Sequence, residues 1–587
     1  MKVLDVQNLS VQYHTGQGHR QALDEVSFSV EKGGIAGIVG ESGSGKSTAM
    51  LAVMGLLAEN ADVTADAIAV CGQQVVPGRD IAMVLQDSLS CLNPTVKIGR
   101  QITETIRAHK NCTRQEARER AEELLDLVGI RNPAQRMRQY PFELSGGMRQ
   151  RTAIAIALAC EPKLIIADEP TTALDAAVQA QIILLLRRIV QDTGTSLLVV
   201  SHDMGVIAAL CSRVYVMQSG RIIEQGTAEE IFYSPQQEYT KKLLRDARGI
   251  QRLRTGEKDS EVLLRLEHVT KVFDTKEGIR DISLEIRKGE IYALAGESGS
   301  GKTTLARILT GLLKPDSGRI SYKGETLDAG TQAGIRQGKI QMVFQDPYGS
   351  LNPCLTAGQA LSEALKALSG TQGGMTPRER RRKAEEMLCM VGLSAEDADR
   401  YPEEFSGGER QRIGIARALI SEPELLICDE ALSALDAATR SQILELLLSI
   451  QKKRKIACLF ISHDLALIRK ISSRISVLYQ GRLAETGDTR EVCSDPWHPY
   501  TKLLLNAAPQ PDLLKARRTR PVLPAETGQE KGSRGCPFAE ACGYTMKCCY
   551  NEVPGSYSFG SRKTACFLYS EEHTGKRAEG YQMTSQI

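Results

Sequence analysis

Two glycine-rich loops, each ending in a lysine and a hydroxyl residue, carry the clearest chemistry in this sequence of 587 residues. The first reads GESGSGKS and ends at Ser47, and the second reads GESGSGKT and ends at Thr303. Glycines at this spacing let backbone N–H groups surround a phosphate, and a following helix adds positive partial charge. Lys46 and Lys302 would then reach the β- and γ-phosphates of a nucleotide, while Ser47 and Thr303 would ligate Mg²⁺. The residues expected to bind the nucleotide here are Gly40, Ser42, Gly43, Gly45, Lys46, Ser47, Thr48, Gly296, Ser298, Gly299, Gly301, Lys302, Thr303 and Thr304.

An acidic pair follows an apolar run in each half of the chain. Asp168 and Glu169 follow LIIA, and Asp429 and Glu430 follow LLIC. A carboxylate at the end of a buried strand stands at the rim of the sheet, where catalytic groups gather. The first acid suits the Mg²⁺ shell, and the second suits orienting or deprotonating an attacking water. The alternative interpretation of each pair, taken alone, is a solvated strand end.

The elements that must position these groups are short apolar runs alternating with helical patterns. Ile35–Val39, Ala82–Leu85, Leu164–Ala167 and Leu197–Val200 lack polar alternation, which is typical of parallel strands covered on both faces. Helical stretches such as Arg114–Val128 lie between them. The pattern predicts an α/β fold with parallel sheets.

The same features occur twice at a nearly constant separation. Lys46 recurs as Lys302, 256 residues later, and Asp168 recurs as Asp429, 261 residues later. A separation of this size indicates a tandem duplication of whole domains, because one hydrophobic core rarely supports so long a chain. The predicted boundaries are domain 1 at 1–244, a polar linker at 245–260, domain 2 at 261–508, and a Cys-rich C-terminal extension at 509–587.

Composition excludes several classes of protein. Hydrophobic residues make up 42% and charged residues 25%, as in ordinary globular chains. Lys and Arg number 74 against 71 Asp and Glu, a formal charge of +3, which argues against nucleic acid as the main partner. No run approaches the roughly 20 apolar residues that cross a bilayer, and the first residues lack the apolar core of a secretory signal.

The order of the motifs resembles that of ABC-type ATPases. A strand-end glutamine follows each glycine loop, and then come SGG-x-x-Q-R, the acidic pair and a strand-end histidine. The glutamines are Gln86 and Gln345, and the histidines are His202 and His463. The resemblance spans most of the chain. It implies two tandem P-loop nucleotide-binding domains, each with a parallel-sheet ATPase core and a helical subdomain.

The resemblance also implies two composite ATP sites, because such domains close head to tail with each ATP between the loop of one and the signature of the other. ATP binding would close the halves, and hydrolysis would reopen them. The implied sites combine Lys46, Ser47, Gln86, Asp168, Glu169 and His202 with Ser406, Gly407 and Gly408, and Lys302, Thr303, Gln345, Asp429, Glu430 and His463 with Ser145, Gly146 and Gly147. Among these, the glutamates, histidines and glutamines are the implied catalytic residues. Mg²⁺ would be held by Ser47, Gln86 and Asp168, and by Thr303, Gln345 and Asp429.

Other assignments from the resemblance depend on less specific signals. Tyr13 and Phe273 match the aromatic residue that stacks on adenine, and Asp175 and Asp436 match the loop that links the two sites. Without this context, Ser145 and its glycines would be a helix-capping turn. Tyr13 and Phe273 would be core aromatics.

Finer features resemble the ATPases of dipeptide, oligopeptide and nickel importers. Leu-Asn-Pro follows soon after each strand-end glutamine, and CSDPWHPYTKLLLNAAP follows the second domain. The first domain has SPQQEYTKKLL at the corresponding place, with Gln-Glu where the second has His-Pro. The resemblance implies peripheral attachment at the cytoplasmic face of the membrane. The implied partners are two transmembrane permease subunits and, indirectly, an extracytoplasmic solute-binding protein. Di- or oligopeptides, nickel or another metal chelate remain open as the solute.

Cysteines gather near the end of the chain. Cys536, Cys542, Cys549 and Cys566 have a spacing that resembles the extension of peptide-importer ATPases, part of which holds a [4Fe–4S] cluster. Zinc is the alternative metal, although the spacing is not that of common structural zinc sites. Cys548 competes with Cys549 as the third ligand. Unliganded thiols in a flexible tail are the remaining interpretation.

Two other functions share parts of this pattern. A tandem ABC translation factor acting on ribosomes would also be soluble, but the predicted linker lacks the long charged helical arm of that group. A DNA-repair ATPase with ABC units would carry zinc modules within its nucleotide domains, whereas both domains here run uninterrupted. The importer ATPase is therefore the favoured interpretation, with the translation factor as its alternative.

Overall fold

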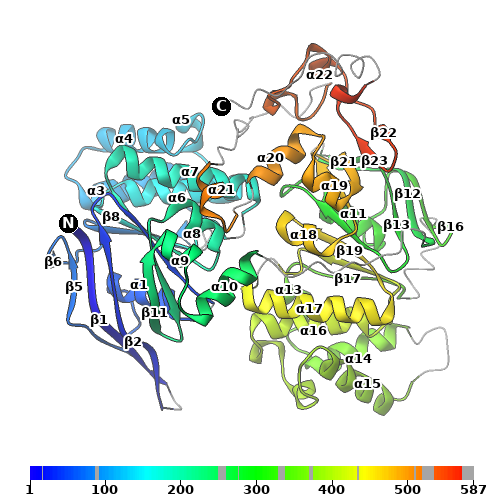
Figure 1. Cartoon of the computed structure of the whole chain (residues 1–587), viewed down its shortest axis with the longest axis horizontal. Helices are drawn as coiled ribbons and strands as arrows, with labels where there is room; N and C mark the ends of the chain where they lie inside the picture. The colour runs from blue at the N-terminus through cyan, green and yellow to red at the C-terminus, as the bar shows by residue number, and fades with distance from the viewer. Residues whose placement is uncertain are drawn as a thin grey trace. The chain divides into compact units, whose positions relative to one another are not determined.

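The computed structural model describes residues 1–15, 18–41, 43–85, 91–172, 174–248, 260–274, 277–327, 338–368, 375–432, 435, 437–507, 510–518 and 535–570. The chain divides into two compact units (Figure 1). Unit 1 comprises Met1–Gly249 and Pro509–Pro521, and unit 2 comprises Ile250–Ala508 and Val522–Ile587. None of the helices in these described ranges is long and apolar enough to cross a membrane.

A six-stranded sheet forms the centre of unit 1, with the order β11-β10-β3-β9-β8-β7. Its strands are β3 (Ile35–Val39), β7 (Ile81–Val84), β8 (Leu164–Asp168), β9 (Ser196–Ser201), β10 (Arg213–Gln218) and β11 (Arg221–Thr227). All neighbours pair in parallel except β11, which is antiparallel at one edge. The parallel strands predicted from unbroken apolar runs are thus confirmed, since such strands are covered on both faces.

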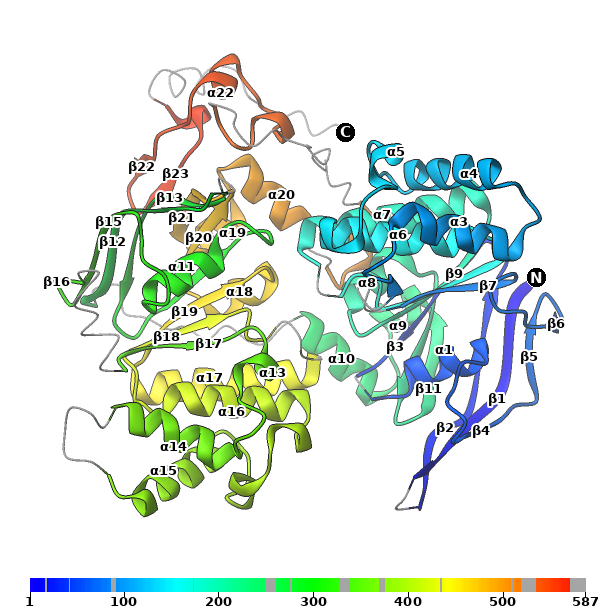
Figure 2. The ribbon, with the colours of Figure 1, turned by 180° about the vertical axis from the view of Figure 1, so that it is seen from behind.

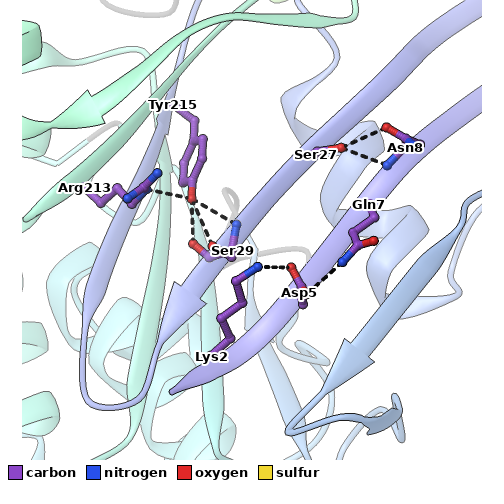
Figure 3. A network of polar contacts seen from close by, with 8 residues as sticks. All are labelled: Lys2, Asp5, Gln7, Asn8, Ser27, Ser29, Arg213 and Tyr215. Carbon is purple, nitrogen blue, oxygen red and sulfur yellow. Dashed lines mark hydrogen bonds and ion pairs between the residues drawn. The ribbon is translucent and has the colours of Figure 1, made fainter.

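A second, antiparallel sheet in unit 1 was not predicted from the sequence. It contains β1 (Lys2–Thr15), β2 (Gly18–Glu31), β4 (Ala61–Thr64), β5 (Ala67–Val70) and β6 (Gln73–Gln74). Figure 3 shows how it joins the parallel sheet: the Tyr215 hydroxyl on β10 accepts from the Ser29 N–H on β2 and donates to the Ser29 carbonyl. Arg213 donates to the same hydroxyl at 3.1 Å. The two sheets and helix α1 (Lys46–Met54) share one hydrophobic cluster. The antiparallel sheet therefore helps to hold α1, the helix that follows the nucleotide loop.

Helices complete unit 1. They are α3 (Ile98–His109), α4 (Arg114–Leu127), α5 (Pro133–Arg136), η1 (Pro141–Glu143), α6 (Gly146–Leu158), α7 (Ala176–Thr193), α8 (Met204–Leu210), α9 (Ala228–Tyr233) and α10 (Glu238–Arg248). Helix α4 confirms the helical pattern seen in the sequence, and a capping box at Thr113 starts it. Helix α10 continues past Arg245, where the linker was predicted to begin.

Unit 1 also contains a helix from far along the chain. Helix α21 (Leu513–Arg518) lies after the second ATPase repeat in sequence, yet it packs against α8 and α9. Leu513 is buried in the main hydrophobic cluster of unit 1, and Arg517 donates to the Cys211 carbonyl at 3.3 Å. The predicted extension at 509–587 therefore has its first helix in unit 1.

Unit 2 repeats this architecture. Its antiparallel sheet contains β12 (Val262–Val272), β13 (Gly278–Arg287), β15 (Ser317–Tyr322) and β16 (Glu325–Thr326). Its larger sheet has the order β17-β18-β19-β14-β20-β21-β23-β22. Those strands are β14 (Ile291–Ala295), β17 (Ile340–Val343), β18 (Leu425–Asp429), β19 (Ala457–Ser462), β20 (Arg474–Tyr479), β21 (Arg482–Asp488), β22 (Tyr557–Phe559) and β23 (Arg562–Thr564).

The helices of unit 2 follow the same plan, with several grouped away from the antiparallel sheet (Figure 2). They are α11 (Lys302–Leu309), α13 (Pro347–Ser350), α14 (Ala357–Leu368), α15 (Pro377–Met390), η2 (Glu396–Asp399), η3 (Pro402–Glu404), α16 (Gly407–Leu419), α17 (Ala437–Arg454), α18 (Leu465–Ile471), α19 (Thr489–Ser494) and α20 (Pro499–Ala507). In both views α14, α15, α16 and α17 lie together, as expected for a helical subdomain.

The Cys-rich segment, residues 535–570, is built into unit 2. It adds η4 (Ala539–Ala541), α22 (Lys547–Asn551), η5 (Phe567–Tyr569) and the hairpin β22–β23, whose second strand pairs with β21. Arg562 on β23 forms an ion pair with the fully buried Glu485 on β21 at 2.7 Å. Phe538 joins a hydrophobic cluster with Tyr500 and Leu504 of α20. This part of the extension is therefore packed onto the sheet.

Candidate nucleotide sites

Each glycine loop joins a central strand to a helix, as the motif requires. In unit 1 the loop leaves β3 and enters α1 at Lys46, whose N-cap Gly45 has a φ of 101°. Only glycine adopts this φ without strain, and a Cβ at Gly40 would clash with the Met217 carbonyl. The Lys46 ammonium donates to the carbonyls of Gly40 at 2.9 Å and of Glu41 at 2.7 Å. The lysine thus lies buried in its own loop.

The second loop has the same geometry. Lys302 starts α11 after Gly301, whose φ is 104°. The Lys302 ammonium donates to the carbonyls of Gly296 at 2.9 Å and of Glu297 at 2.7 Å. Among the other predicted loop residues, Gly43 and Gly299 also have positive φ, while Ser42 lies outside the described residues. The duplication predicted from sequence therefore extends to the hydrogen bonds of the loop.

Next to each lysine, a buried aspartate has an oxygen without a hydrogen-bond partner. Asp168 ends β8 and is hydrogen-bonded by Ser47, and Asp429 ends β18 and is hydrogen-bonded by Thr303. In both cases Oδ1 is buried without a partner within the described part of the chain. Burial raises the pKa of each aspartate above its usual value, against the effects of the hydroxyl and the lysine. A hydroxyl beside an unsatisfied carboxylate oxygen is a donor set that fits Mg²⁺.

The second acid of unit 1 is oriented from two sides. Glu169 Oε1 lies 2.8 Å from His202 Nδ1, and Thr172 donates to Oε2 at 2.9 Å. Burial opposes ionisation of Glu169, but the hydrogen bond and charge of His202 outweigh it, so the pKa of Glu169 lies below its usual value. Thr172, which differs from Ser433 of the second repeat, was not predicted to act here. Gln86 lies outside the described residues.

The second acid of unit 2 has a looser version of this arrangement. Glu430 Oε1 lies 3.6 Å from His463 Nδ1 and 3.7 Å from the Lys302 ammonium. Gln345 donates to Glu430 Oε2 at 3.0 Å. Burial again opposes ionisation, and the His463 contact again leads the effects that hold the pKa of Glu430 below its usual value. The structure thus brings loop lysine, acidic pair, glutamine and histidine together in unit 2.

The signature segments begin helices α6 and α16. Ser145 is the N-cap of α6 and accepts from the Met148 N–H at 3.3 Å, and Ser406 is the N-cap of α16. The helix-capping interpretation of these serines is therefore correct as local structure. A Cβ at Gly408 would lie 2.6 Å from Thr439 Cγ2, whereas a Cβ at Gly407 would have no atom of the described residues within 4 Å. Packing within the unit explains the second glycine of the signature and leaves the first unexplained.

The less specific assignments have mixed surroundings. Tyr13 lies on β1, half-buried against a hydrophobic cluster. Phe273 follows β12 and is 41% exposed, with the Lys271 ammonium 6.0 Å from its ring centre. Asp175 caps α7 by accepting from the Val178 N–H at 3.0 Å, and Asp436 lies outside the described residues. Phe273 is thus accessible for stacking, while Tyr13 also fits the core interpretation.

The four predicted cysteines line one small cavity. Cys536, Cys542, Cys549 and Cys566 surround a space of about 20 Å³ together with His498 and other residues, and Cys548 is not among its lining residues. Burial raises the pKa of the Cys536 thiol to about 11 and that of Cys566 to about 12. No three His, Cys, Asp or Glu side chains in the described ranges stand close enough to hold a metal ion as they are.

Two tyrosines near the loops were missed by sequence reasoning. The Glu41 N–H donates to the Tyr239 hydroxyl of α10 at 3.0 Å, and the Glu297 N–H donates to the Tyr500 hydroxyl of α20 at 3.0 Å. The available signal was the Tyr-Thr-Lys shared by the two segments that follow the ATPase repeats.

Comparisons with known proteins agree with this geometry. The family described as ABC transporter matches residues 23–172 and 279–433, and the C-terminal region of oligopeptide/dipeptide transporters matches residues 484–549. The glutathione import ATP-binding protein GsiA of Escherichia coli O157:H7 is 38% identical to this chain, over 94% of the chain and 96% of that protein. The protein of the same name from Escherichia coli strain K12 is 37% identical over the same shares.

Both matched ABC segments contain a complete glycine loop and its acidic pair, and the similarity to these relatives extends along nearly the whole chain. The chain therefore belongs to the ABC transporter family.

Proposed function

We propose that this chain is the ATP-hydrolysing subunit of an ABC importer for short peptides. The carrying observation is that both units have a loop lysine, a hydroxyl–aspartate pair and a glutamate beside a histidine. Two such units in one chain supply both ATPase sites of a transporter. The match to the oligopeptide/dipeptide transporter region, and relatives named for glutathione import, support a peptide as the solute over nickel.

The arrangement supports the following chemistry in each unit. Lys46 leaves the Gly40 and Glu41 carbonyls when a nucleotide arrives, because the phosphates offer a stronger charge-assisted partner. Ser47 and Asp168 would hold Mg²⁺, which would supply positive charge beside the phosphates. Glu169, oriented by His202 and Thr172, accepts a hydrogen bond from the attacking water.

The signature glycines would act only in the ATP-bound state. We infer that Gly407, whose Cα faces open space, leaves room for the γ-phosphate of an ATP held by the loop of the first unit. Gly146 would do the same for the second loop. N–H groups at a helix N-terminus suit an anion, so closure would stabilise the charge that develops in phosphoryl transfer.

Transport requires partners that cross the membrane. We propose two permease subunits, with the chain attached peripherally at the cytoplasmic face, and an extracytoplasmic solute-binding protein that acts through the permease. The relatives' role in import and the oligopeptide transporter region support this assignment. A translation factor acting on ribosomes remains the rival function.

Co-purification tests this proposal. The double variant Glu169→Gln, Glu430→Gln would keep ATP bound without hydrolysing it, whereas Lys46→Ala, Lys302→Ala would not bind ATP and serves as the control. Each would be tagged in its native cells and purified with its bound partners. Two multi-span membrane proteins recovered with the trapped variant support the importer, and ribosomes recovered in their place would overturn it.

We also propose that the cysteine cavity holds a [4Fe–4S] cluster, with zinc as the alternative metal. The four thiols that line one cavity support it, and Cys549 takes the place that the sequence left open between Cys548 and Cys549. Burial raises the pKa of the Cys536 and Cys566 thiols, so a bound cation would have to displace the protons of these two ligands. A bound cluster or zinc ion would stabilise the packing of the extension against the ATPase sheet.

Metal analysis with paired variants tests the cluster. Iron, zinc and acid-labile sulfide would be measured on anaerobically purified chain, on Cys542→Ser, and on Cys548→Ser as the matched control. Loss of iron and sulfide in Cys542→Ser alone supports the cluster, and loss of zinc alone supports zinc. Equal metal content in all three proteins would show that the cavity is not the site.

A further inference from the structure

The second helix after the last large strand of each ATPase repeat, α10 in unit 1 and α20 in unit 2, contacts the nucleotide loop. In unit 2, the Tyr500 hydroxyl on α20 accepts the N–H of Glu297, and the carbonyl of Glu297 accepts the Lys302 ammonium. One residue of the loop is thus held by the tyrosine on its N–H side and contacts the phosphate-binding lysine on its carbonyl side. A loop held at this point has fewer conformations to lose when a nucleotide binds.

Aromatic rings from two directions fix this tyrosine. Tyr500 is fully buried, with the Tyr479 ring centre 4.3 Å away and the Phe538 ring centre 5.6 Å away. The backbone N–H of Tyr500 also donates to His498 Nδ1 at 3.0 Å. Phe538 belongs to the Cys-rich extension, and Phe538 and His498 both line the cysteine cavity. A chain of direct contacts therefore leads from the cysteine cavity through Tyr500 to the second nucleotide loop.

Unit 1 has the hydrogen bond, but the residues described there give Tyr239 no such aromatic cover. The Tyr239 hydroxyl accepts the N–H of Glu41, but Tyr239 is only half-buried. Gln218 stands at the position that Tyr479 occupies in unit 2, and the Cys-rich extension follows the second repeat alone. In unit 1, Lys242 of α10 instead contacts the Glu41 carboxylate at 3.3 Å. The two loops are thus held by the same hydroxyl but supported by different surroundings.

We propose that Tyr239 and Tyr500 are positioning residues for the two nucleotide loops, and that Phe538 makes the ATP affinity of the second site depend on the Cys-rich extension. The coupling is reciprocal, so a nucleotide bound at the second site stabilises the packing of the extension. The first site has no such dependence. The proposed coupling gives the His-Pro-Tyr segment of the second repeat a function. The coupling requires neither a particular solute nor a metal in the cavity.

Nucleotide titration of the full chain tests the positioning role. Lys46→Ala leaves only the second site, and Lys302→Ala leaves only the first. Binding of the Mg²⁺ complex of a non-hydrolysable ATP analogue would be measured by calorimetry in each background. We expect Tyr500→Phe to weaken the second site by about three- to tenfold, as the loss of one hydrogen bond implies, and Tyr239→Phe to do so at the first. An unchanged affinity in either variant would overturn the positioning role of the tyrosine that it replaces.

Two phenylalanines of the extension test the coupling. Phe538→Leu should weaken nucleotide binding at the second site and leave the first within about twofold. Phe559 lies in the same extension and packs on Trp497 of the second repeat, so it provides the control. Phe559→Leu should leave both sites unchanged. Adding Phe538→Leu to Tyr500→Phe should weaken binding little further, because both act through one contact. The coupling would be overturned if Phe538→Leu and Phe559→Leu lowered the affinity of the second site equally. It would also be overturned if the effects of Phe538→Leu and Tyr500→Phe on that affinity were fully additive.

Failure of this inference can be distinguished from failure of the proposed function. If the chain with Lys46→Ala bound no analogue at all, the second nucleotide site itself would be in error. If the analogue bound with the same affinity in Tyr500→Phe and Phe538→Leu as in the parent chain, the proposed ATPase function would stand. Only the positioning role and the coupling would then be refuted.

Discussion

At the scale of the residue, Glu169 and Glu430 have a backbone conformation that costs energy for any residue except glycine. Their φ values are 47° and 46°, and each lies directly after the last residue of its strand. The N–H of Glu169 donates to the Val200 carbonyl, and that of Glu430 donates to the Ile461 carbonyl. In both units this strained conformation accompanies the contact of the carboxylate with its histidine.

The two loop lysines lead to a prediction about how many sites hydrolyse ATP. Lys46→Ala and Lys302→Ala should each lower the ATPase rate by at least about tenfold, because each ammonium supplies charge that phosphoryl transfer needs. Steady-state hydrolysis by the purified chain measures this. Lys241→Ala, which loses a contact to Glu238 within the same surface helix, serves as the control. A normal ATPase rate in either variant would mean that the site of the substituted lysine does not hydrolyse ATP and that only the other site does.

His498 predicts a dependence of stability on pH. Burial lowers its pKa from 6.5 to about 4, against the opposing effect of a hydrogen bond with the Ala565 backbone. In the neutral ring, Nδ1 accepts the Tyr500 N–H. Folding therefore favours the neutral form, so the stabilisation is complete above pH 6.5 and decreases as the pH falls from 6.5 towards 4. The expected loss is about 1.4 kcal/mol by about pH 5.5.

Urea unfolding followed by fluorescence of Trp497, the single tryptophan, measures this loss. His498→Gln should unfold with a smaller pH dependence over the same range, whatever its absolute stability. Parallel pH profiles for the two proteins would mean that His498 titrates normally in the folded chain.

At the scale of the element, the two signature glycines of α16 have different neighbours. Gly408 contacts α17 so closely that a Cβ would lie 2.6 Å from Thr439, whereas a Cβ at Gly407 would meet none of the described part of the chain within 4 Å. The same contrast appears in α6, where a Cβ at Gly147 would lie 2.6 Å from Val178 and one at Gly146 would lie 3.7 Å from Leu174. Helix packing therefore requires one glycine, and the other is free to meet a ligand.

This contrast predicts opposite effects of one methyl group. Gly408→Ala should destabilise unit 2 by about 1–3 kcal/mol through overpacking. Gly407→Ala should not destabilise it, because alanine is the better helix former by up to about 1 kcal/mol. Gly407→Ala should nevertheless lower ATP hydrolysis by about tenfold or more, since a displaced phosphate reacts poorly. Thermal unfolding and ATPase rates separate the two effects. Full activity in Gly407→Ala would remove that glycine from the site.

At the scale of the whole molecule, distant parts of the chain complete each unit. Helix α21 supplies Leu513 to the core of unit 1, and strand β23 extends the main sheet of unit 2. Arg562 of β23 pairs with the fully buried Glu485 and lies over the Trp497 ring at 3.8 Å. Both Glu485 and the corresponding acid of unit 1, Glu224, accept from two backbone N–H groups at matching positions. Glu224 accepts in addition from the Thr240 hydroxyl. The extension thus supplies a partner that unit 1 finds locally.

Removing that partner should weaken unit 2 strongly. Arg562→Met leaves Glu485 buried without its cation, which costs about 3–5 kcal/mol. The neighbouring and exposed Lys563→Met is the control and should cost less than about 0.5 kcal/mol. Urea unfolding monitored at Trp497 compares them, and adding Glu485→Gln to Arg562→Met should recover part of the loss. Equal stability of the two methionine variants would mean that the ion pair contributes little.

Much of the nucleotide machinery could be predicted because its signals are local. Strand, glycine loop, lysine and helix follow one another within a few residues, so adjacent letters encode both the turn and its chemistry. The central parallel strands were recognisable for a similar reason, since burial on both faces leaves an unbroken apolar run. The antiparallel sheet was missed because β1 and β2 carry bulges and mixed faces that blur their alternation.

The sequence alone thus determined the family, the duplicated ATPase sites and the four cysteines of interest. Only the tertiary structure decided the contacts between residues far apart, such as Tyr500 with Glu297, 203 positions earlier, or Arg562 with Glu485. It also placed Cys549, which is buried on α22, among the residues that line the cavity, and Cys548 is not one of those lining residues. Side-chain direction and long-range packing depend on the assembled fold, and no short stretch of sequence encodes them.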